Sequence, residues 1–219
     1  MLRAVFEKTG DAVYISHLDL MRLFQRAFKR AGLPLTHTQG FNPRPSVSIA
    51  LPLSLGVESS CELLDFDLEG ESPAGEEIAA RLNNALIDGV RVLSVYKEGR
   101  KIKHLALLDC IVTMEYDALI PDGTVEQISA LFSREEVTVE KKSKNGITEQ
   151  NIIPMIRRIC VSQTGDGELE LRALICCQNP TLNPIQLSTA ITKYLPELAP
   201  DFVHCRRVEI YDETETIFR

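Results

Sequence analysis

The chain has 219 residues, of which 44% are hydrophobic and 25% charged, and its formal net charge at pH 7 is −7. This is an ordinary globular composition, with enough length to bury a proper core in one large domain or two small ones. The chain has no apolar run of about 18 residues, so we expect no membrane span. The N-terminus lacks a basic region followed by an apolar stretch, so we expect no signal peptide.

The first half of the chain predicts alternating strands and helices in the order β-α-β-β-α-β. Alternating apolar residues predict strands at 2–6, 46–50, 62–68 and 90–96. Helical spacing predicts helices between residues 16 and 32 and over 72–86, the second with Ser72 as N-cap and Pro73 at its first position. The segment 58–77 holds eight acidic residues and no basic one, which favours a solvated sheet edge followed by a helix N-terminus.

The helix after residue 16 carries sequence marks at both ends. Ser16 is a good N-cap, and Asp19 stands in capping-box position three residues later. Gly32 supplies the left-handed residue that ends a helix, Leu33 can fold back on Phe28, and Pro34 prevents continuation. The sequence therefore predicts both boundaries of this helix.

The same helix has an apolar stripe and a basic stripe. The basic stripe consists of Arg22, Arg26, Lys29 and Arg30. Residues 1–50 hold seven Lys and Arg against three Asp and Glu, a local charge of about +4 in a chain of −7. A solvated face is one interpretation of this stripe. The alternative is a local surface for an anionic partner.

The loop after the helix has the most unusual local sequence. Residues 39–45 hold two prolines and a glycine, which make the loop rigid and reduce the entropy lost on binding. Polar and cationic side chains that suit a nucleotide or a phosphate accompany an aromatic ring in and beside this loop: His37, Gln39, Phe41, Asn42 and Arg44. The alternative is a structural crossover that packs on Phe41.

Two histidines are weak candidates for acid–base catalysis. His17 stands at the first helical position and His37 follows the same helix, and a metal-independent ribonuclease uses such groups as general acid or base. A histidine at a helix start is more commonly a polar surface residue. No phosphate-binding, dinucleotide-binding or serine-hydrolase motif occurs, and no metal-ligand spacing is present.

The second half repeats the order of the first without a residue-level repeat. We expect strands at 109–116, 137–142, 169–176 and 202–211 and helices at 123–132 and 184–194, with an interruption around 144–146 and a segment of open type at 152–161. We therefore predict an α+β fold of two tandem ferredoxin-like (βαββαβ) domains, 1–98 and 106–219. The linker between them holds a second basic cluster: Arg100, Lys101, Lys103 and His104.

Six cysteines occur without a C-x-x-C pair. Several stand in apolar, strand-like contexts, so we interpret the cysteines as small buried residues in a reducing compartment. The chain itself is expected to hold no metal or cofactor.

Four segments resemble a bacterial family known as radical SAM-linked proteins, a domain of unknown function (DUF2344). They are I-S-H-L-D-L-M-R at 15–22, R-A-G-L-P at 30–34, Q-G-F-N-P at 39–43, and A-L-P-L at 50–53 with Gly56 and Glu58. The resemblance is specific over about the first 70 residues. It implies a cytoplasmic accessory role beside a radical SAM protein, with S-adenosylmethionine and an iron–sulfur cluster held by that partner. It implies no activity.

These observations leave three functional hypotheses. The first is an accessory protein that presents RNA, such as tRNA or rRNA, to a radical SAM partner. Its contacts would be His17, Arg22, Arg26, Lys29, Arg30, Gln39, Phe41, Asn42 and Arg44. The second is an adaptor that docks on the partner without touching RNA, which the lack of Trp and the 6% aromatic content favour. The third is a metal-independent endoribonuclease, for which the domain order resembles CRISPR repeat-processing enzymes only at the level of fold.

Overall fold

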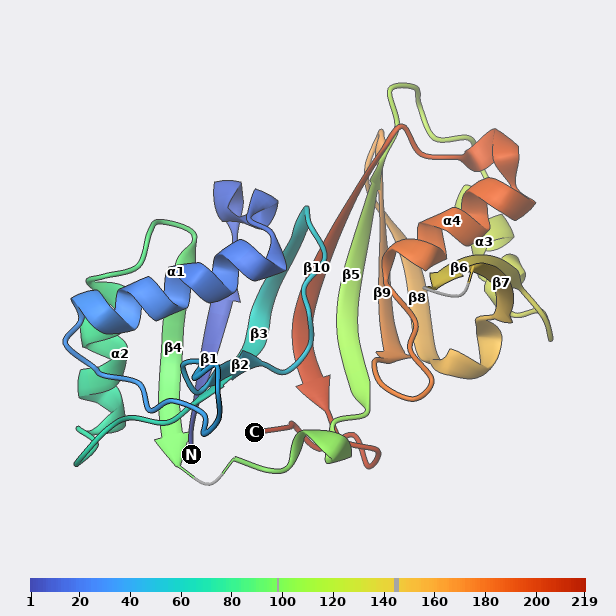
Figure 1. Cartoon of the computed structure of the whole chain (residues 1–219). Coiled ribbons are helices and arrows are strands. Elements are labelled where there is room, and N and C mark those ends of the chain that lie inside the picture. The colour runs from blue at the N-terminus through green and yellow to red at the C-terminus, as the bar shows by residue number, and fades with distance from the viewer. Residues whose placement is uncertain (98, 144–145) are drawn as a thin grey trace. The chain divides into compact units, whose positions relative to one another are not determined.

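The computed structural model describes residues 1–97, 99–143 and 146–219 (Figure 1). The chain forms two compact units, residues 1–102 together with Arg219, and residues 103–218. Residue 98, the end of the predicted first domain, lies outside the described residues, as do residues 144 and 145 within the expected interruption. The architecture is of mixed α+β class, as predicted.

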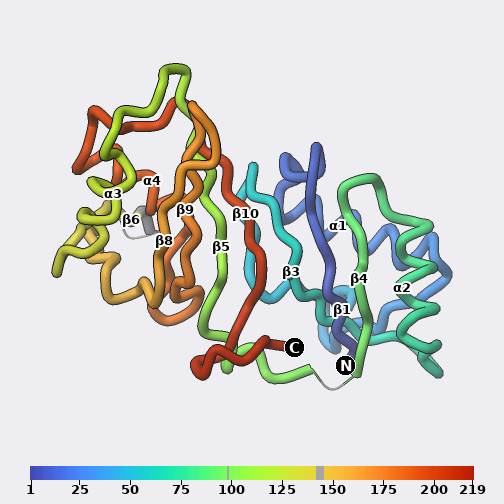
Figure 2. Tube along the Cα trace, turned by 180° about the vertical axis from the view of Figure 1, so that it is seen from behind, coloured from blue at the N-terminus to red at the C-terminus, as the bar shows by residue number. Residues whose placement is uncertain are grey.

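The N-terminal unit is a small antiparallel sheet with two helices. Its elements in chain order are β1 (Leu2–Lys8), η1 (Gly10–Tyr14), α1 (His17–Arg30), β2 (Val47–Ile49), β3 (Val57–Phe66), α2 (Gly75–Asn83) and β4 (Val90–Lys97). The strands lie in the order β4-β1-β3-β2, and each neighbouring pair is antiparallel. Both helices lie on the same side of these strands (Figures 1 and 2).

The core of this unit lies between the sheet and the helices. Alternate residues of β1, namely Leu2, Ala4 and Phe6, face it and are buried. Helix α1 contributes Phe24, whose ring stands edge-on to that of Phe6 at 4.8 Å between centroids, together with Phe28. Because the apolar stripe of α1 is held in this core, its basic stripe is presented to solvent.

The predicted ends of α1 are confirmed. The Ser16 hydroxyl accepts a hydrogen bond from the backbone N–H of Asp19 at 3.2 Å, which satisfies a free donor of the first turn. Gly32 has φ +65°, and the N–H of Leu33 donates to the carbonyl of Phe28 at 2.9 Å, which closes the helix C-terminus.

Helix α2 begins later than the sequence indicated. It starts at Gly75 with Ala74 as N-cap, so the expected roles of Ser72 and Pro73 are wrong. A Cβ at Gly75 would lie 2.2 Å from the carbonyl oxygen of Val95, so the helix can approach β4 closely only with glycine here. This close contact between α2 and β4 fixes where the first turn of α2 begins. No local sequence pattern indicates it.

The acidic segment does not form a solvated sheet edge. Strand β3 lies between β1 and β2 and is buried along most of its length. Glu62 is 3% exposed and Asp65 is 8% exposed, and Asp65 pairs with Arg3 of β1. The charges of this strand therefore belong to the interior, where a partner compensates the cost of burial.

The C-terminal unit has a four-stranded sheet, two helices and a separate hairpin. Its elements are β5 (Leu107–Glu115), α3 (Thr124–Phe132), β6 (Thr138–Ser143), β7 (Gly146–Asn151), η3 (Ile153–Met155), β8 (Ile156–Gly165), β9 (Glu168–Cys176), α4 (Ile185–Tyr194), η4 (Pro196–Leu198) and β10 (Phe202–Tyr211). The short helix η2 (Ile102–His104) precedes them. The sheet order within the unit is β10-β5-β9-β8, with antiparallel neighbours.

One strand of this unit is placed differently from the expectation. The segment 137–142, predicted as the second strand of the sheet, pairs instead with 146–151 as a separate two-stranded hairpin. The second sheet strand is β8, which covers much of the segment whose type the sequence left open. Tyr194 of α4 holds the hairpin, because its hydroxyl accepts from the backbone N–H of Thr138 at 3.0 Å. Among the described residues, no helix has the length and apolar character needed to cross a membrane.

Candidate functional site

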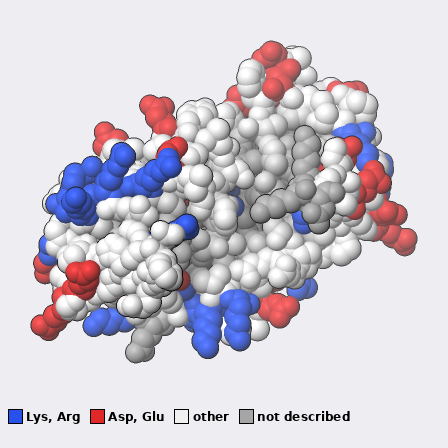
Figure 3. Space-filling view, in the orientation of Figure 1, with Lys and Arg blue, Asp and Glu red and all other residues white. Residues whose placement is uncertain are grey.

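The exposed side of α1 carries a row of cations. Arg22, Arg26, Lys29 and Arg30 are all exposed, and Figure 3 shows Lys and Arg side chains gathered over this helix. Arg22 is held by Asp19, with 2.9 Å between Nη1 and Oδ1, and Arg30 donates to the carbonyl of Ala85. The helical period places Arg26 one turn after Arg22 and Lys29 about one turn after Arg26. The row therefore extends along the exposed length of the helix.

The loop after α1 is a closed hairpin rather than a packed crossover. Its base is held by a hydrogen bond from Ser46 N–H to the Thr36 carbonyl at 2.7 Å and by one from Thr38 N–H to the Arg44 carbonyl at 2.9 Å. The side chain of Phe41 at the tip is fully exposed. The interpretation in which the loop packs on Phe41 is therefore wrong, because nothing in the described part of the unit covers the ring.

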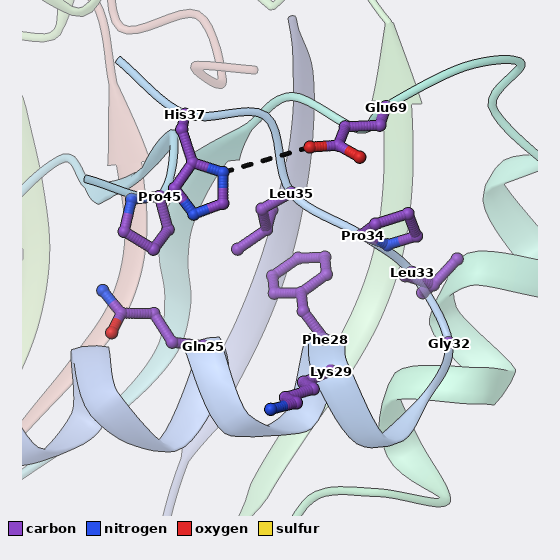
Figure 4. Close-up of a pocket in the computed structure, with 10 residues that line it drawn as sticks. All are labelled: Gln25, Phe28, Lys29, Gly32, Leu33, Pro34, Leu35, His37, Pro45 and Glu69. Atoms are coloured by element: carbon purple, nitrogen blue, oxygen red, sulfur yellow. Dashed lines mark ion pairs between the residues drawn. The ribbon is translucent and has the colours of Figure 1, made fainter. Parts of the chain in front are cut away.

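An open pocket of about 460 Å³ lies between α1 and the base of this hairpin (Figure 4). Its lining residues come from α1, from the segment that follows it, and from the turn after β3: Gln25, Phe28, Lys29, Gly32, Leu33, Pro34, Leu35, His37, Pro45 and Glu69. The buried side chains of Phe28, Leu33 and Leu35 form the apolar part of the lining. The pocket is within the size range of small-ligand sites.

The polar groups of the pocket stand at its rim. Nδ1 of His37 lies 4.0 Å from Oε1 of Glu69, and both side chains are about half exposed. Gln25 and Lys29 line the same pocket from α1 (Figure 4). The backbone N–H of Glu69 donates to the carbonyl of Pro34 at 2.9 Å, which places the carboxylate beside the segment that follows α1. The pocket thus combines an apolar interior with a cation, an amide, an imidazole and a carboxylate at its edge.

The structure separates the two candidate histidines. His37 lines the pocket, whereas His17 begins α1, about 12 Å of helix away from Gln25. Nδ1 of His17 is buried and has no hydrogen-bond partner among the residues that the structure describes. No observation joins the two as an acid–base pair, so the endoribonuclease hypothesis stays a prediction.

The remaining predicted residues divide between the pocket and the hairpin. Lys29 lines the pocket, and the hairpin tip presents four exposed residues: Gln39, Phe41, Asn42 and Arg44. Sequence reasoning missed Gln25 and Glu69. The helical period places Gln25 one turn before Lys29 on the same side of α1, so the helical pattern could have identified Gln25 as a site residue. Glu69 gave no such indication, because β3 pairing brings it to the site from 40 residues beyond Lys29.

Within the described parts of the chain, no three His, Cys, Asp or Glu side chains gather where they could hold a metal ion. Cys61, Cys110, Cys177 and Cys205 are buried, and only Cys160 is exposed among these described thiols.

The fold and this site describe an α+β protein with a basic helix beside a ligand-sized pocket. The chain belongs to a family described as an uncharacterized protein conserved in bacteria (DUF2344), whose model matches residues 1–184. Residues 1–102 of the N-terminal unit, and with them the candidate site, lie inside the matched range. No curated protein matches the chain.

Solved structures of similar fold include a chain of a Cbf5–Nop10–Gar1 complex, with a TM-score of 0.52 and 9% identity. The match covers 96% of this chain and 50% of that chain, so this chain spans about half the length of that protein. A second structure, an unknown protein from Galdieria sulphuraria, has a TM-score of 0.27 and 12% identity over 94% of this chain and 97% of that chain. The likeness to the first structure concerns the fold alone.

Proposed function

We propose that this protein is an RNA-binding accessory protein of a radical SAM enzyme. The observation that carries the RNA proposal is the exposed row of cations on α1 beside a closed hairpin with a fully exposed aromatic tip. Phosphate groups bind Lys and Arg without regard to sequence, and unpaired bases stack on aromatic rings. The row and the tip belong to one unit of a chain whose net charge is negative, so the positive charge is local.

Each group of residues has a defined role in this proposal. Arg22, Arg26, Lys29 and Arg30, with Arg44 of the hairpin, bind phosphates. Gln39 and Asn42 supply polar contacts, Phe41 stacks on a base, and His17 extends the contact surface at the start of α1. The hairpin is closed by backbone hydrogen bonds before any ligand arrives, so little conformational entropy is lost when RNA binds.

We further propose that both units are variants of the ferredoxin-like fold. The N-terminal unit supports this with the strand order β4-β1-β3-β2, and the C-terminal unit with β10-β5-β9-β8, which is the same order once the β6-β7 hairpin is treated as an insertion. In each unit a helix follows the first strand, although in the C-terminal unit the hairpin separates that helix from the second sheet strand.

The radical SAM partner is proposed on the family resemblance, and S-adenosylmethionine and the iron–sulfur cluster would belong to that partner. Co-expression with a radical SAM protein from the same genome, followed by affinity purification and nuclease treatment, tests the association. A one-to-one complex that survives nuclease supports it, and separate elution of the two proteins contradicts it.

RNA binding is tested by fluorescence anisotropy with total bacterial tRNA and a structured rRNA fragment at low and moderate salt. We expect micromolar or tighter binding that weakens as salt rises, because phosphate contacts release counterions. Arg22→Glu/Arg26→Glu removes binding, and so does Arg26→Glu/Lys29→Glu, which leaves the Asp19–Arg22 pair intact. The matched control is Arg91→Glu/Lys97→Glu, which reverses two exposed charges on β4 and leaves binding nearly unchanged. No binding by the wild type contradicts the proposal.

A protein–protein adaptor is the second candidate. The observation that favours it is the exposure of two large apolar side chains where η1 meets α1, with Tyr14 at 70% and Leu18 at 67% exposed. Apolar surface of this kind suits a protein partner better than a phosphate backbone. Tyr14→Ser/Leu18→Ser would weaken the complex with the radical SAM protein under this hypothesis and leave RNA affinity unchanged.

A further inference from the structure

We infer that the pocket between α1 and the hairpin base binds one unstacked nucleobase of single-stranded RNA. This inference rests on the proposed RNA-binding function and assigns the part of the site that reads a base rather than the backbone. Proteins recognise single-stranded RNA by splaying bases out, holding their faces against side chains and hydrogen-bonding their edges. The pocket has an apolar interior and polar groups at its rim, and it opens beside the cations of α1.

The interior of the pocket suits the faces of a planar ring. Phe28, Leu33 and Leu35 are 1%, 2% and 7% exposed, so their positions are fixed by the core before a ligand binds. Pro34 and Pro45 line the pocket from the two chain segments at the hairpin base. Rigid walls limit the entropy lost when a base enters.

The rim of the pocket suits the edge of a base. The Gln25 amide both donates and accepts, the His37 imidazole offers a ring nitrogen, and the Glu69 carboxylate accepts. A carboxylate pairs with the exocyclic amine of a base. Uracil carries no exocyclic amine, so we expect adenine, cytosine or guanine to enter in preference to uracil.

The charge around the pocket selects a nucleotide over a purely apolar ligand. Lys29 stands at the rim, and Arg26 and Arg22 continue the positive row along α1. A base in the pocket would leave its 5′ and 3′ phosphates outside, near these cations. An apolar side chain of a protein partner would fill the interior but leave the polar groups of the rim without hydrogen-bond partners, so RNA is the better complement.

The base contribution is tested with three nine-nucleotide single-stranded RNAs that differ only at the central position. They carry adenine, uracil or an abasic ribose there, and the other eight positions are abasic in all three. We expect the wild type to bind the adenine oligonucleotide about tenfold more tightly than the abasic one, as for a stacked base, with uracil between them. The slope of affinity against salt should be the same for all three, because their phosphates are identical.

Two variants assign this difference to the pocket. Gln25→Trp places an indole in the opening and should reduce adenine binding to the abasic level without altering the salt slope. Ala80→Trp on the exposed side of α2 is the matched control and should retain the tenfold difference. Glu69→Ala, at an exposed position that does not risk the core, should reduce the preference for adenine over uracil.

The outcomes separate the inference from the proposed function. Salt-sensitive binding with equal affinity for adenine and abasic RNA overturns the pocket inference and leaves the RNA-binding function standing. Loss of the radical SAM complex in Gln25→Trp, with no base dependence, assigns the pocket to a protein partner and also overturns it. No RNA binding by the wild type at any salt overturns both.

Discussion

Arg3 and Asp65 form a buried, bidentate ion pair between the adjacent strands β1 and β3. Nε of Arg3 lies 2.6 Å from Oδ1 of Asp65, and Nη2 lies 2.9 Å from Oδ2. The two residues are direct partners in the strand register. Nη1 of Arg3 donates to the carbonyl of Arg100 at 2.7 Å, so the pair also ties the segment after β4 to the sheet. Burial lowers the pKa of Arg3, but Asp65 and Tyr96 together more than offset this, so the pKa of Arg3 is raised.

Breaking this pair should strongly destabilise the protein. Asp65→Asn leaves the Arg3 charge buried without its counter-charge, and we expect a loss of about 3–5 kcal/mol in the free energy of unfolding. The double variant Arg3→Met/Asp65→Leu removes both charges and should recover most of that loss. Urea unfolding followed by circular dichroism measures both. A double variant no more stable than Asp65→Asn would show that specific hydrogen bonds, rather than an uncompensated charge, dominate.

The cap of α1 should respond to pH through Asp19. The Ser16 hydroxyl donates to the Asp19 carboxylate at 2.8 Å and Arg22 donates at 2.9 Å, and together they lower its pKa. A carboxyl with a lower pKa in the folded state binds fewer protons there than in the unfolded chain. Its stabilisation is therefore present above the unfolded pKa, about 3.9, and is lost as pH falls through the folded pKa.

Asp19→Asn should thus lower Tm at pH 7, and the difference from the wild type should shrink below about pH 4 as the wild-type carboxyl protonates. Differential scanning calorimetry from pH 7 to pH 3 measures this. Asp88→Asn, at an exposed aspartate of the same unit, is the control and should show little difference at any pH. An Asp19→Asn effect that is constant with pH would mean that the carboxylate charge contributes nothing to the cap.

Local chemistry accounts for what the sequence predicted well. Helix α1 was predictable to its ends because Ser16, Asp19 and Gly32 act on backbone groups within a few residues of themselves. The strands of the first half were predictable from alternation, but β3 was taken for an edge. The alternation of apolar and polar residues cannot distinguish a buried polar residue of a central strand from a solvent-exposed polar residue of an edge strand. Asp65 is buried only because Arg3 lies opposite it in another strand.

The rest depends on pairings between distant segments. Whether 137–142 joins the sheet or forms a hairpin is decided by competition with β8 for the edge of β9, and both segments have strand-like sequences. The pocket was likewise hidden, because Glu69 reaches it through sheet pairing while Lys29 reaches it through helical spacing. The sequence indicated the cationic half of the site, and only the fold places the carboxylate beside it.

The cysteines should differ sharply in their reactivity. Burial raises the pKa of Cys205 to about 11, and it raises that of Cys110 further still. The thiolate is the reactive form, so both should resist iodoacetamide at pH 8, whereas Cys160 is exposed on β8 and should react first. Peptide mass spectrometry over a time course measures the order. Cys160→Ser should remove the fast phase, and early modification of Cys205 in the native protein would contradict its burial.

Phe41 should matter for RNA binding and not for stability. Its ring is 106% exposed, so Phe41→Ala removes no packing, and we expect the free energy of unfolding to change by less than about 0.5 kcal/mol. The loss of a stacking partner should weaken single-stranded RNA binding by about 1–3 kcal/mol. Phe41→Tyr, which keeps the ring, is the control and should bind nearly as well as the wild type. Anisotropy and thermal unfolding of the three proteins decide the matter. Unchanged affinity in Phe41→Ala would leave the phosphate contacts of α1 as the basis of binding, and a large loss of stability would show that the hairpin tip packs against the unit.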